Sequence, residues 1–326
     1  MPRPPLQVQL ASAHDAADAG DRLLAEIRFG HKTGPDRDDP RCIDVGVPPL
    51  FDGPDRELWL ADSAVTPDRR DGIGFAHTDN LLFTHIHLPD TTDMAAAARE
   101  AYERLLAFHR DSGFPALLRI WNYFDRLLEP ARQPGLDRYQ AFCAGRHEAL
   151  EAAGLEAATL PAATAIGTGT AGLIVYALAA REPGVQIENP RQVSAYHYPP
   201  DYGPKSPTFS RATLKQWTAG AQLFISGTAS IVGHASLHEG DVLAQANEIL
   251  DNLGALIGRV REQHPSLELN GPHDLSLLKV YVKRAADADA VREQVRTRIG
   301  AHPNVVFLRG DICRRELLTE IEGLYA

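Results

Sequence analysis

The feature that most constrains the fold is an alternation of apolar strand-like segments and amphipathic helical segments, which runs through two cycles. The first cycle predicts a strand over 81–88, a helix over 93–113, a strand over 116–124, a helix over 136–154 and a bent strand pair over 162–182. The second cycle predicts a strand over 221–233, a helix over 241–263, a strand over 275–284, a helix over 286–300 and strands over 303–310 and 316–323. We therefore expect two copies of one unit.

A short local similarity supports the two copies. The segments 117-LLRIW-121 and 277-LLKVY-281 fall at the same step of the two cycles, with helices of similar length around them. A single barrel would need about eight strand–helix cycles. The sequence thus predicts an α+β fold with two mixed-sheet units, each with helices on one face.

Two segments lie outside the repeated order. The first seventy residues are rich in Pro, Asp and Gly, so we expect few regular elements there and assign 1–185 to an N-terminal unit with an irregular wrapping segment. Residues 186–218 connect the units and are too long and too rich in Pro, Tyr and basic residues for a simple linker. Because such loops often carry function, we expect this segment to bind substrate, and we place the C-terminal unit over 219–326.

Composition and charge limit the class of function. A chain of 326 residues with 44% hydrophobic residues can bury a large core, and its net charge of -10, without a dense Lys/Arg run, argues against a nucleic-acid partner. The start of the chain does not resemble an export signal and no apolar run is long enough to span a membrane, so we expect no membrane partner and a cytoplasmic location. Cys42, Cys143 and Cys313 form no CxxC pair, which argues against a zinc knuckle and a disulfide framework.

Basic and tyrosine side chains gather in the connecting segment. Guanidinium and phenol groups together can bind a carboxylate through directed hydrogen bonds. The alternative is a solvated loop in which proline prevents regular structure. The residues concerned are Arg191, Tyr196, Tyr198, Tyr202, Lys205, Ser210, Arg211 and Lys215.

Two glycine-rich stretches and one histidine pair suggest other chemistries. The stretch 225-ISGTASIVGH-234 ends an apolar strand with small residues, but neither it nor 166-IGTGTAG-172 matches GxGxxG or carries the lysine of a phosphate loop. Nucleotide binding is therefore not favoured, and 166–172 is expected to form a bulge or a tight turn. His85 and His87 project from one face of a strand, as in some metal hydrolases, but no second ligand pair follows. The alternatives for this pair are a metal site and a structural role.

Acidic residues alternate in the last expected strand. Strand geometry would place Glu316, Leu318, Glu320 and Glu322 on one face. A row of acids that faced solvent would be an ordinary surface, and the residue pattern alone favours this interpretation. A carboxyl group that faced an apolar pocket would instead have a raised pKa and could act as a general acid near neutral pH.

Six segments together resemble the chorismatase family. In chain order they are 119-RIWNYF-124, 143-CAGRHEAL-150, 188-ENPRQVSAY-196, 202-YGPKSPTFSRA-212, 225-ISGTASIVGH-234 and 309-RGDICRRELLTEIEG-323. The resemblance covers most of the chain and implies two units similar to the Rid-type (chorismate-mutase-like) subunit, packed as a pseudo-trimer with extra helices. It also implies chorismate as the substrate, an active site near the C-terminus, and chemistry without a metal or an organic cofactor.

The resemblance also assigns roles to individual residues. Glu320 matches the acid beside the enolpyruvyl ether of chorismate, and protonation of the terminal methylene would start the release of pyruvate. The two carboxylates of the substrate require cationic anchors. The expected substrate-binding residues are Arg146, Tyr202, Lys205, Arg211, Ser226, Gly227 and Ala229.

Two residues bear on the product. A cysteine at the position of Cys313 resembles the members that convert chorismate to 3-hydroxybenzoate, whereas Ala229 departs from the glycine of dedicated 3-hydroxybenzoate producers. We therefore expect pyruvate and 3-hydroxybenzoate, with 4-hydroxybenzoate as a further product. The alternatives are hydrolysis to a dihydroxy-cyclohexadiene carboxylate and a non-catalytic Rid-like sensor of aromatic acids. Because one chain would supply what three small subunits supply elsewhere, a monomer is expected.

Overall fold

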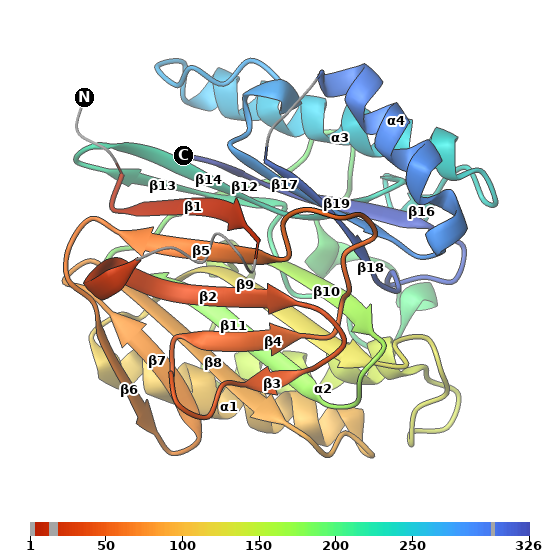
Figure 1. The fold of residues 1–326 in the computed structure, drawn as a ribbon. Coiled ribbons are helices and arrows are strands. Elements are labelled where there is room, and N and C mark those ends of the chain that lie inside the picture. The colour runs from red at the N-terminus through yellow and green to blue at the C-terminus, as the bar shows by residue number, and fades with distance from the viewer. Residues whose placement is uncertain (1–3, 13–18, 301–303) are drawn as a thin grey trace.

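Three large sheets face one another around a shared core (Figure 1). The computed structural model describes residues 4–12, 19–300 and 304–326. Trp59, Trp121 and Tyr281 come from the three different sheets and are all buried in this core. The sheets thus pack as a pseudo-trimer, as the family resemblance implied.

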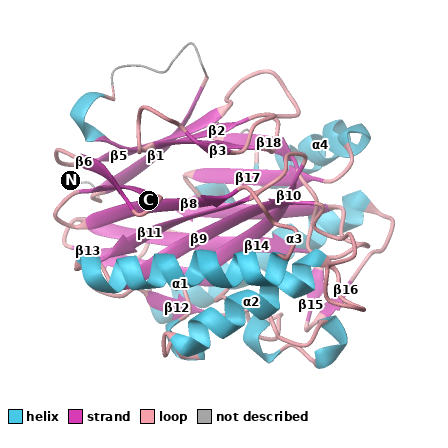
Figure 2. Ribbon diagram, turned by 90° about the horizontal axis from the view of Figure 1, so that it is seen from below, coloured by secondary structure: helices cyan, strands magenta, loops and turns pink. Residues whose placement is uncertain are grey.

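The first copy of the unit forms a six-stranded sheet in the order β10-β9-β11-β8-β7-β6. Its elements are β6 (Thr66–Arg70), β7 (Ile73–His77), β8 (Leu81–Leu88), α1 (Met94–Ser112), β9 (Ala116–Asp125), α2 (Arg138–Ala152), β10 (Ala162–Thr168) and β11 (Leu173–Ala180). β9 and β10 pair in parallel, and the other neighbouring strands pair antiparallel. α1 and α2 lie side by side along the outer face of this sheet (Figure 2).

The second copy forms another six-stranded sheet in the order β12-β13-β14-β19-β17-β18. Its elements are β12 (Val185–Ile187), β13 (Ala212–Trp217), β14 (Gly220–Ala229), α3 (Val242–Gln263), β17 (Leu277–Val282), α4 (Ala288–Ile299), β18 (Val305–Arg309) and β19 (Thr319–Tyr325), with the small hairpin of β15 (Ile231–Val232) and β16 (Ala235–Ser236) after β14. Read from its parallel pair, β18-β17, this order matches that of the first sheet strand for strand. The two predicted copies are therefore confirmed, with α3 and α4 on the outer face of the second sheet (Figure 1).

The register of the strands shows which residues are equivalent in the two copies. The matched segments place Trp121 of β9 at the position of Tyr281 of β17. Trp121 lies opposite Tyr176 of β11, and Tyr281 lies opposite Glu320 of β19. Tyr176 therefore occupies in the first copy the place that Glu320 occupies in the second.

The prediction of an irregular segment over the first seventy residues is wrong. β1 (Leu6–Ala11), β2 (Leu23–Phe29), β3 (Gly34–Pro35), β4 (Cys42–Val45) and β5 (Arg56–Ala61) form a sheet in the order β1-β5-β2-β4-β3. Leu24, Ile27, Ile43 and Trp59 of this sheet are buried in the shared core. Proline, aspartate and glycine lie mostly in the turns between these short strands, so the composition of the segment concealed the strands.

The connecting segment is partly built into the second sheet. β12 and β13 pair with each other at one edge of that sheet, so that the expected segment 186–218 begins and ends in strands. The expected strand over 316–323 begins only at Thr319, and residue 303 of the expected strand over 303–310 lies outside the described residues. The residues before Thr319 are therefore free to form a loop.

Side-chain caps fix where the first helices begin. Asp93 accepts a hydrogen bond from Ala96 N–H at the start of α1. Asp137 and Gln140 form a capping box at the start of α2. None of the helices in the described part of the chain combines the length and the apolarity that a membrane crossing requires.

Candidate active site

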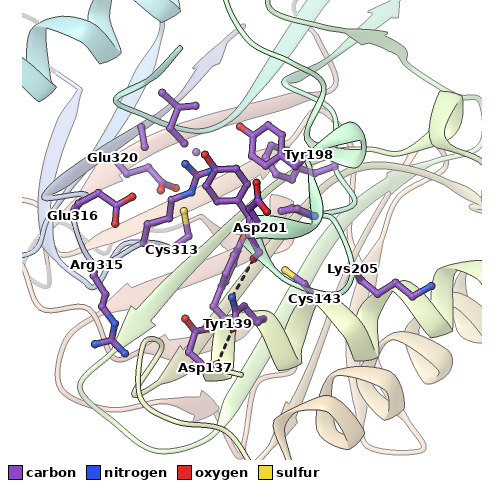
Figure 3. Close-up of a pocket in the computed structure, with 18 of the residues that line it drawn as sticks. Asp137, Tyr139, Cys143, Tyr198, Asp201, Lys205, Cys313, Arg315, Glu316 and Glu320 are labelled. Carbon is purple, nitrogen blue, oxygen red and sulfur yellow. Dashed lines mark hydrogen bonds between the residues drawn. The ribbon is translucent and has the colours of Figure 1, made fainter. Parts of the chain in front are cut away.

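A cavity of about 260 Å³ lies where the connecting segment, α2 and the strands β14 and β19 meet (Figure 3). Asp137 and Gln140, which form the capping box of α2, lie in the cavity wall. The loop before β19 closes another side. Residues that line it include Tyr139, Cys143, Tyr202, Arg211, Cys313 and Glu320. Concave sites of this kind, with a few polar groups, bind small molecules.

Glu320 projects into this cavity from β19. In the sheet it lies opposite Ala229 of β14 on one side and Tyr281 of β17 on the other. Glu320 is only 4% exposed. A Cβ atom on Gly227 would lie 1.8 Å from Glu320 Oε1, so the carboxyl group rests directly on the glycine backbone. Gly227, expected among the substrate-binding residues, thus also allows close approach of the acid.

The surroundings of Glu320 favour its neutral form. Burial, and then the negative charge of Glu322, raises the pKa of Glu320 to about 8, although Arg119 and Arg211 act in the opposite direction. A carboxyl group that keeps its proton at neutral pH can serve as a general acid.

The interpretation that the acids of the last strand face solvent is wrong. β19 is a central strand and is covered on both faces, so Ile321 packs in the core with α3 and α4 while Glu320 and Glu322 face the space between the sheets. Glu316 lies in the loop before the strand, where it accepts a hydrogen bond from Ser236 Oγ at 2.7 Å. The sequence pattern could not distinguish a central strand from an edge strand.

Arg211 provides a buried cation beside the cavity. Its Nη2 atom donates to Val193 O at 2.9 Å and to Tyr198 Oη at 2.8 Å. Its Nε atom is buried and has no hydrogen-bond partner among the described residues. Because an unpaired buried donor is costly, this arrangement favours an anionic ligand.

Tyr202 and Lys205 also line the cavity, together with a residue that sequence reasoning missed. The guanidinium carbon of Arg314 lies 3.8 Å from the centre of the Tyr202 ring, and the Tyr202 hydroxyl lies 3.1 Å from His234 Nδ1. The Lys205 side chain extends outward from the cavity in Figure 3. The available signal for Arg314 was the arginine pair that directly follows Cys313, within a segment already recognised as similar to the family.

Arg146 and Ser226 are not among the residues that line the cavity. Arg146 is 2% exposed, and its guanidinium carbon lies 5.0 Å from the centre of the Phe142 ring. Ser226 Oγ donates to Ser210 O at 2.6 Å and accepts from Ala163 N–H at 2.9 Å. Both side chains support the walls rather than face the cavity.

Cys313 lies beside Glu320 at the cavity wall (Figure 3). Burial, and then the charge of Glu320, raises the pKa of the Cys313 thiol to about 12. The thiol is therefore neutral and poorly nucleophilic, so its size and weak polarity are what it brings to the cavity. Cys143 of α2 lines the same cavity and was not predicted as a site residue.

The histidine pair and the second glycine-rich stretch lie elsewhere. His85 Nε2 lies 2.9 Å from Pro40 O, and burial lowers the pKa of His85 to about 4. In the ranges that the structure describes, no group of three or more His, Cys, Asp or Glu residues is arranged to hold a metal ion. Of the stretch 166–172, expected to form a bulge or a tight turn, residues 169–172 connect β10 and β11, whereas residues 166–168 belong to β10.

Comparison with known proteins finds relatives along most of the chain. The family described as "Chorismatase FkbO/Hyg5-like, N-terminal" matches residues 57–179. A 3-hydroxybenzoate synthase from Streptomyces hygroscopicus is 40% identical over 277 residues, which cover 83% of this chain and 81% of that protein. A chorismatase from Streptomyces rapamycinicus is 39% identical over 277 residues, which cover 83% of this chain and 82% of that protein. A crystal structure of a chorismatase, 35% identical, superposes with a TM-score of 0.91 and covers 100% of this chain and 99% of that one.

Proposed function

Because the chain belongs to the chorismatase family, we propose that it converts chorismate to pyruvate and 3-hydroxybenzoate, with Glu320 as the acid that starts the reaction. The observation that carries the assignment of Glu320 is its buried carboxyl group, which faces a cavity that also contains Arg211. Cys313 and Ala229, beside this carboxyl group, are the residues that would influence how the product forms.

The chemistry follows from the substrate. The terminal methylene of an enol ether accepts a proton at carbon, which leaves an oxocarbenium-like centre next to the ether oxygen. A ring hydroxyl or a water molecule captures this centre, and pyruvate then leaves. Formation of 3-hydroxybenzoate and pyruvate uses all the atoms of chorismate and no oxidant, so the step requires a proton donor of suitable strength.

The cations around the cavity fit a ligand with two carboxylates. Arg211, with its unpaired Nε, is the proposed partner of one carboxylate. Arg314, held against the Tyr202 ring, is the proposed partner of the other, and Lys205 at the rim would join it by turning its side chain inward. Arg146 of α2 takes an indirect part, because its guanidinium packs on the Phe142 and Tyr102 rings instead of facing the cavity.

Incubation of the purified protein with chorismate tests the function. We expect pyruvate together with 3-hydroxybenzoate, with 4-hydroxybenzoate as a further product, when the products are separated by chromatography. A hydrolase would release pyruvate with a dihydroxy-cyclohexadiene carboxylate. A sensor would bind aromatic acids without releasing pyruvate.

The proposal extends to assembly and location. Because one chain supplies all three of the large sheets, we propose that the protein is a monomer. Light scattering after size-exclusion chromatography would test this. Cys42, Cys143 and Cys313 are free thiols, which fits a reducing compartment such as the cytoplasm.

Cys313→Ala is expected to increase several-fold the share of dihydroxy-cyclohexadiene carboxylate, the product that forms when water captures the reactive centre. Removal of the thiol leaves room for a water molecule next to Glu320, where the reactive centre forms. The measurement is the chromatographic ratio of dihydroxy-cyclohexadiene carboxylate to hydroxybenzoates. Cys42→Ala, in the N-terminal sheet, is the control and should leave the ratio unchanged. An unchanged ratio in Cys313→Ala would remove this cysteine from the mechanism.

The pH dependence of kcat/KM is expected to have an alkaline limb near the pKa of Glu320. The active form of the acid is protonated, and burial raises its pKa to about 8, so activity should be constant below that pH and fall about tenfold per pH unit above it. Initial rates of pyruvate release across this range measure the limb. A fall centred near the ordinary pKa of a glutamic acid would show that Glu320 is not the sheltered acid proposed here.

A further inference from the structure

Glu322 follows Glu320 by two residues in β19 and joins a buried set of charged groups between the three sheets. Its Oε1 atom lies 2.6 Å from Lys279 Nζ of β17, and its Oε2 atom lies 2.9 Å from Arg119 Nη2 of β9. Lys279 Nζ also lies 3.1 Å from Glu57 Oε1 of β5. Each of these four side chains is 3% exposed or less. We call Glu57, Arg119, Lys279 and Glu322 the central network.

The central network is electrically balanced without Glu320. Two carboxylates, Glu57 and Glu322, face two cations, Arg119 and Lys279. The two cations occupy equivalent positions in the two copies. Burial opposes ionisation of Glu322, but Lys279 and then Arg119 lower its pKa. Ionisation of Glu320 would add a negative charge with no matching cation in this set, which a buried site disfavours.

Thr164 of β10 links the central network to the acid. Thr164 Oγ1 donates to Glu322 Oε2 at 2.5 Å and accepts from Gly227 N–H at 2.9 Å. Arg119 Nη2 also donates to Thr164 Oγ1. The hydroxyl thus uses its one donor and both acceptor positions. Gly227 is the residue on which the Glu320 carboxyl group rests. A chain of contacts therefore runs from Glu322 through Thr164 and Gly227 to Glu320.

We propose that Glu322 is a positioning residue for the reaction: its carboxylate fixes Thr164 and Gly227 beneath Glu320, and its negative charge acts together with burial to keep the proton on Glu320. This inference rests on the proposed role of Glu320 as the acid. A buried ion network of this kind is weak evidence for stability, because apolar side chains of similar volume often stabilise a protein at least as well. A positioning role gives Glu322 a function that an apolar side chain could not supply.

Other groups also face Glu320 and must be considered in any test of pH dependence. They are Arg119 on β9, Arg211 in the connecting segment and Cys313 in the loop before β19. Both arginines favour ionised Glu320, so they act against Glu322. Without the Glu322 charge, only burial would oppose their effect on the pKa of Glu320.

Glu322→Gln is the direct test, with Glu57→Gln as its matched control. Both changes replace a buried carboxylate that contacts Lys279, but only Glu322 bonds to Thr164. In Glu322→Gln the alkaline limb of kcat/KM is expected to move to lower pH by at least about one unit. In Glu57→Gln the thermal stability is expected to fall while the limb stays within about 0.3 pH unit of its original position. An unmoved limb in folded Glu322→Gln, or equal shifts in both variants, would overturn the proposal.

A second pair of variants decides the question if Glu322→Gln does not fold. Thr164→Val removes the hydroxyl but keeps the volume, and it is expected to lower kcat about tenfold with little change in KM. Thr164→Ser keeps the hydroxyl and is expected to restore most of kcat. Equal kcat values for the valine and serine variants would overturn the proposal. The activity of Glu320→Gln tests the role of Glu320 separately from the role of Glu322. If Glu320→Gln remains active, Glu320 is not the acid. If only the Glu322 and Thr164 tests fail, Glu320 remains the proposed acid and the positioning role of Glu322 is wrong.

Discussion

Glu320→Gln is expected to lower kcat for pyruvate release by about 1000-fold or more at neutral pH. The amide has nearly the same shape as the carboxyl group but cannot donate a proton to carbon. Pyruvate formation from chorismate measures the effect. Glu316→Gln is a suitable control, because Glu316 lines the same cavity from the loop before β19, and its rate should stay within a few-fold of the original. Comparable losses in both variants would mean that the effect of Glu320→Gln does not report a specific proton donor.

The same substitution is expected to stabilise the fold at alkaline pH. The folded pKa of about 8 lies above the ordinary value of 4.5, so the folded state binds a proton more tightly than the unfolded state between these values. The stability of the unaltered protein therefore falls as pH rises from 4.5 to about 8, whereas glutamine does not titrate. Thermal unfolding should show a higher Tm for Glu320→Gln at pH 9 and little difference at pH 4.5. A uniform difference at both pH values would contradict the proposed burial of the acid.

Gly227→Ala is expected to lower kcat about 100-fold by displacing the acid. The new Cβ atom would lie 1.8 Å from Glu320 Oε1 and 2.8 Å from its Cδ atom, so the carboxyl group must move. The backbone of Gly227 is not in the left-handed region, so the alanine itself adds no strain there. Steady-state kinetics with chorismate measure the loss.

A double-mutant cycle separates this clash from other effects of Gly227→Ala. In a Glu320→Ala background the Cβ atom no longer meets a carboxyl group, so the cost of Gly227→Ala in thermal stability should largely disappear. Gly254→Ala in α3 is the control, because no atom of the described residues outside its own helix lies within 4 Å of the added Cβ; it should be neutral or stabilising. An equal cost of Gly227→Ala in both backgrounds would mean that the glycine serves some purpose other than making room for Glu320.

The repeated architecture could be predicted because strong local patterns agree with it. β11 is a continuous apolar run, and α1 and α3 have clear caps and apolar faces. The N-terminal sheet could not be predicted, because its short strands are held together by contacts with distant parts of the chain. Trp59 of β5, for example, packs against Phe83 and Trp121 of the first copy. Long-range packing of this kind leaves no periodic signal in a short segment.

The candidate site could be predicted only in part, for a related reason. Family resemblance pointed to Glu320, Cys313 and Arg211, and these residues do meet at one cavity. Alternation along β19 showed that Glu320 and Glu322 share a face, but burial of that face depends on a third sheet that the sequence did not reveal. Arg146 was expected at the substrate because it is a cation in a matching segment, yet the turn of α2 directs its side chain onto Phe142.

The two copies carry different residues at one equivalent position, Tyr176 in the first and Glu320 in the second. Such a difference is possible because the two copies are parts of one chain. In a ring of identical subunits, every junction must carry the same acid, and each buried acid lowers the stability of the ring at neutral pH. Here the first copy places an aromatic ring at that position, stacked on Trp121 with the ring centroids 4.9 Å apart. The second copy can therefore carry a proton donor that lowers stability, Glu320, while the stacked Tyr176 and Trp121 rings stabilise the equivalent position in the first copy.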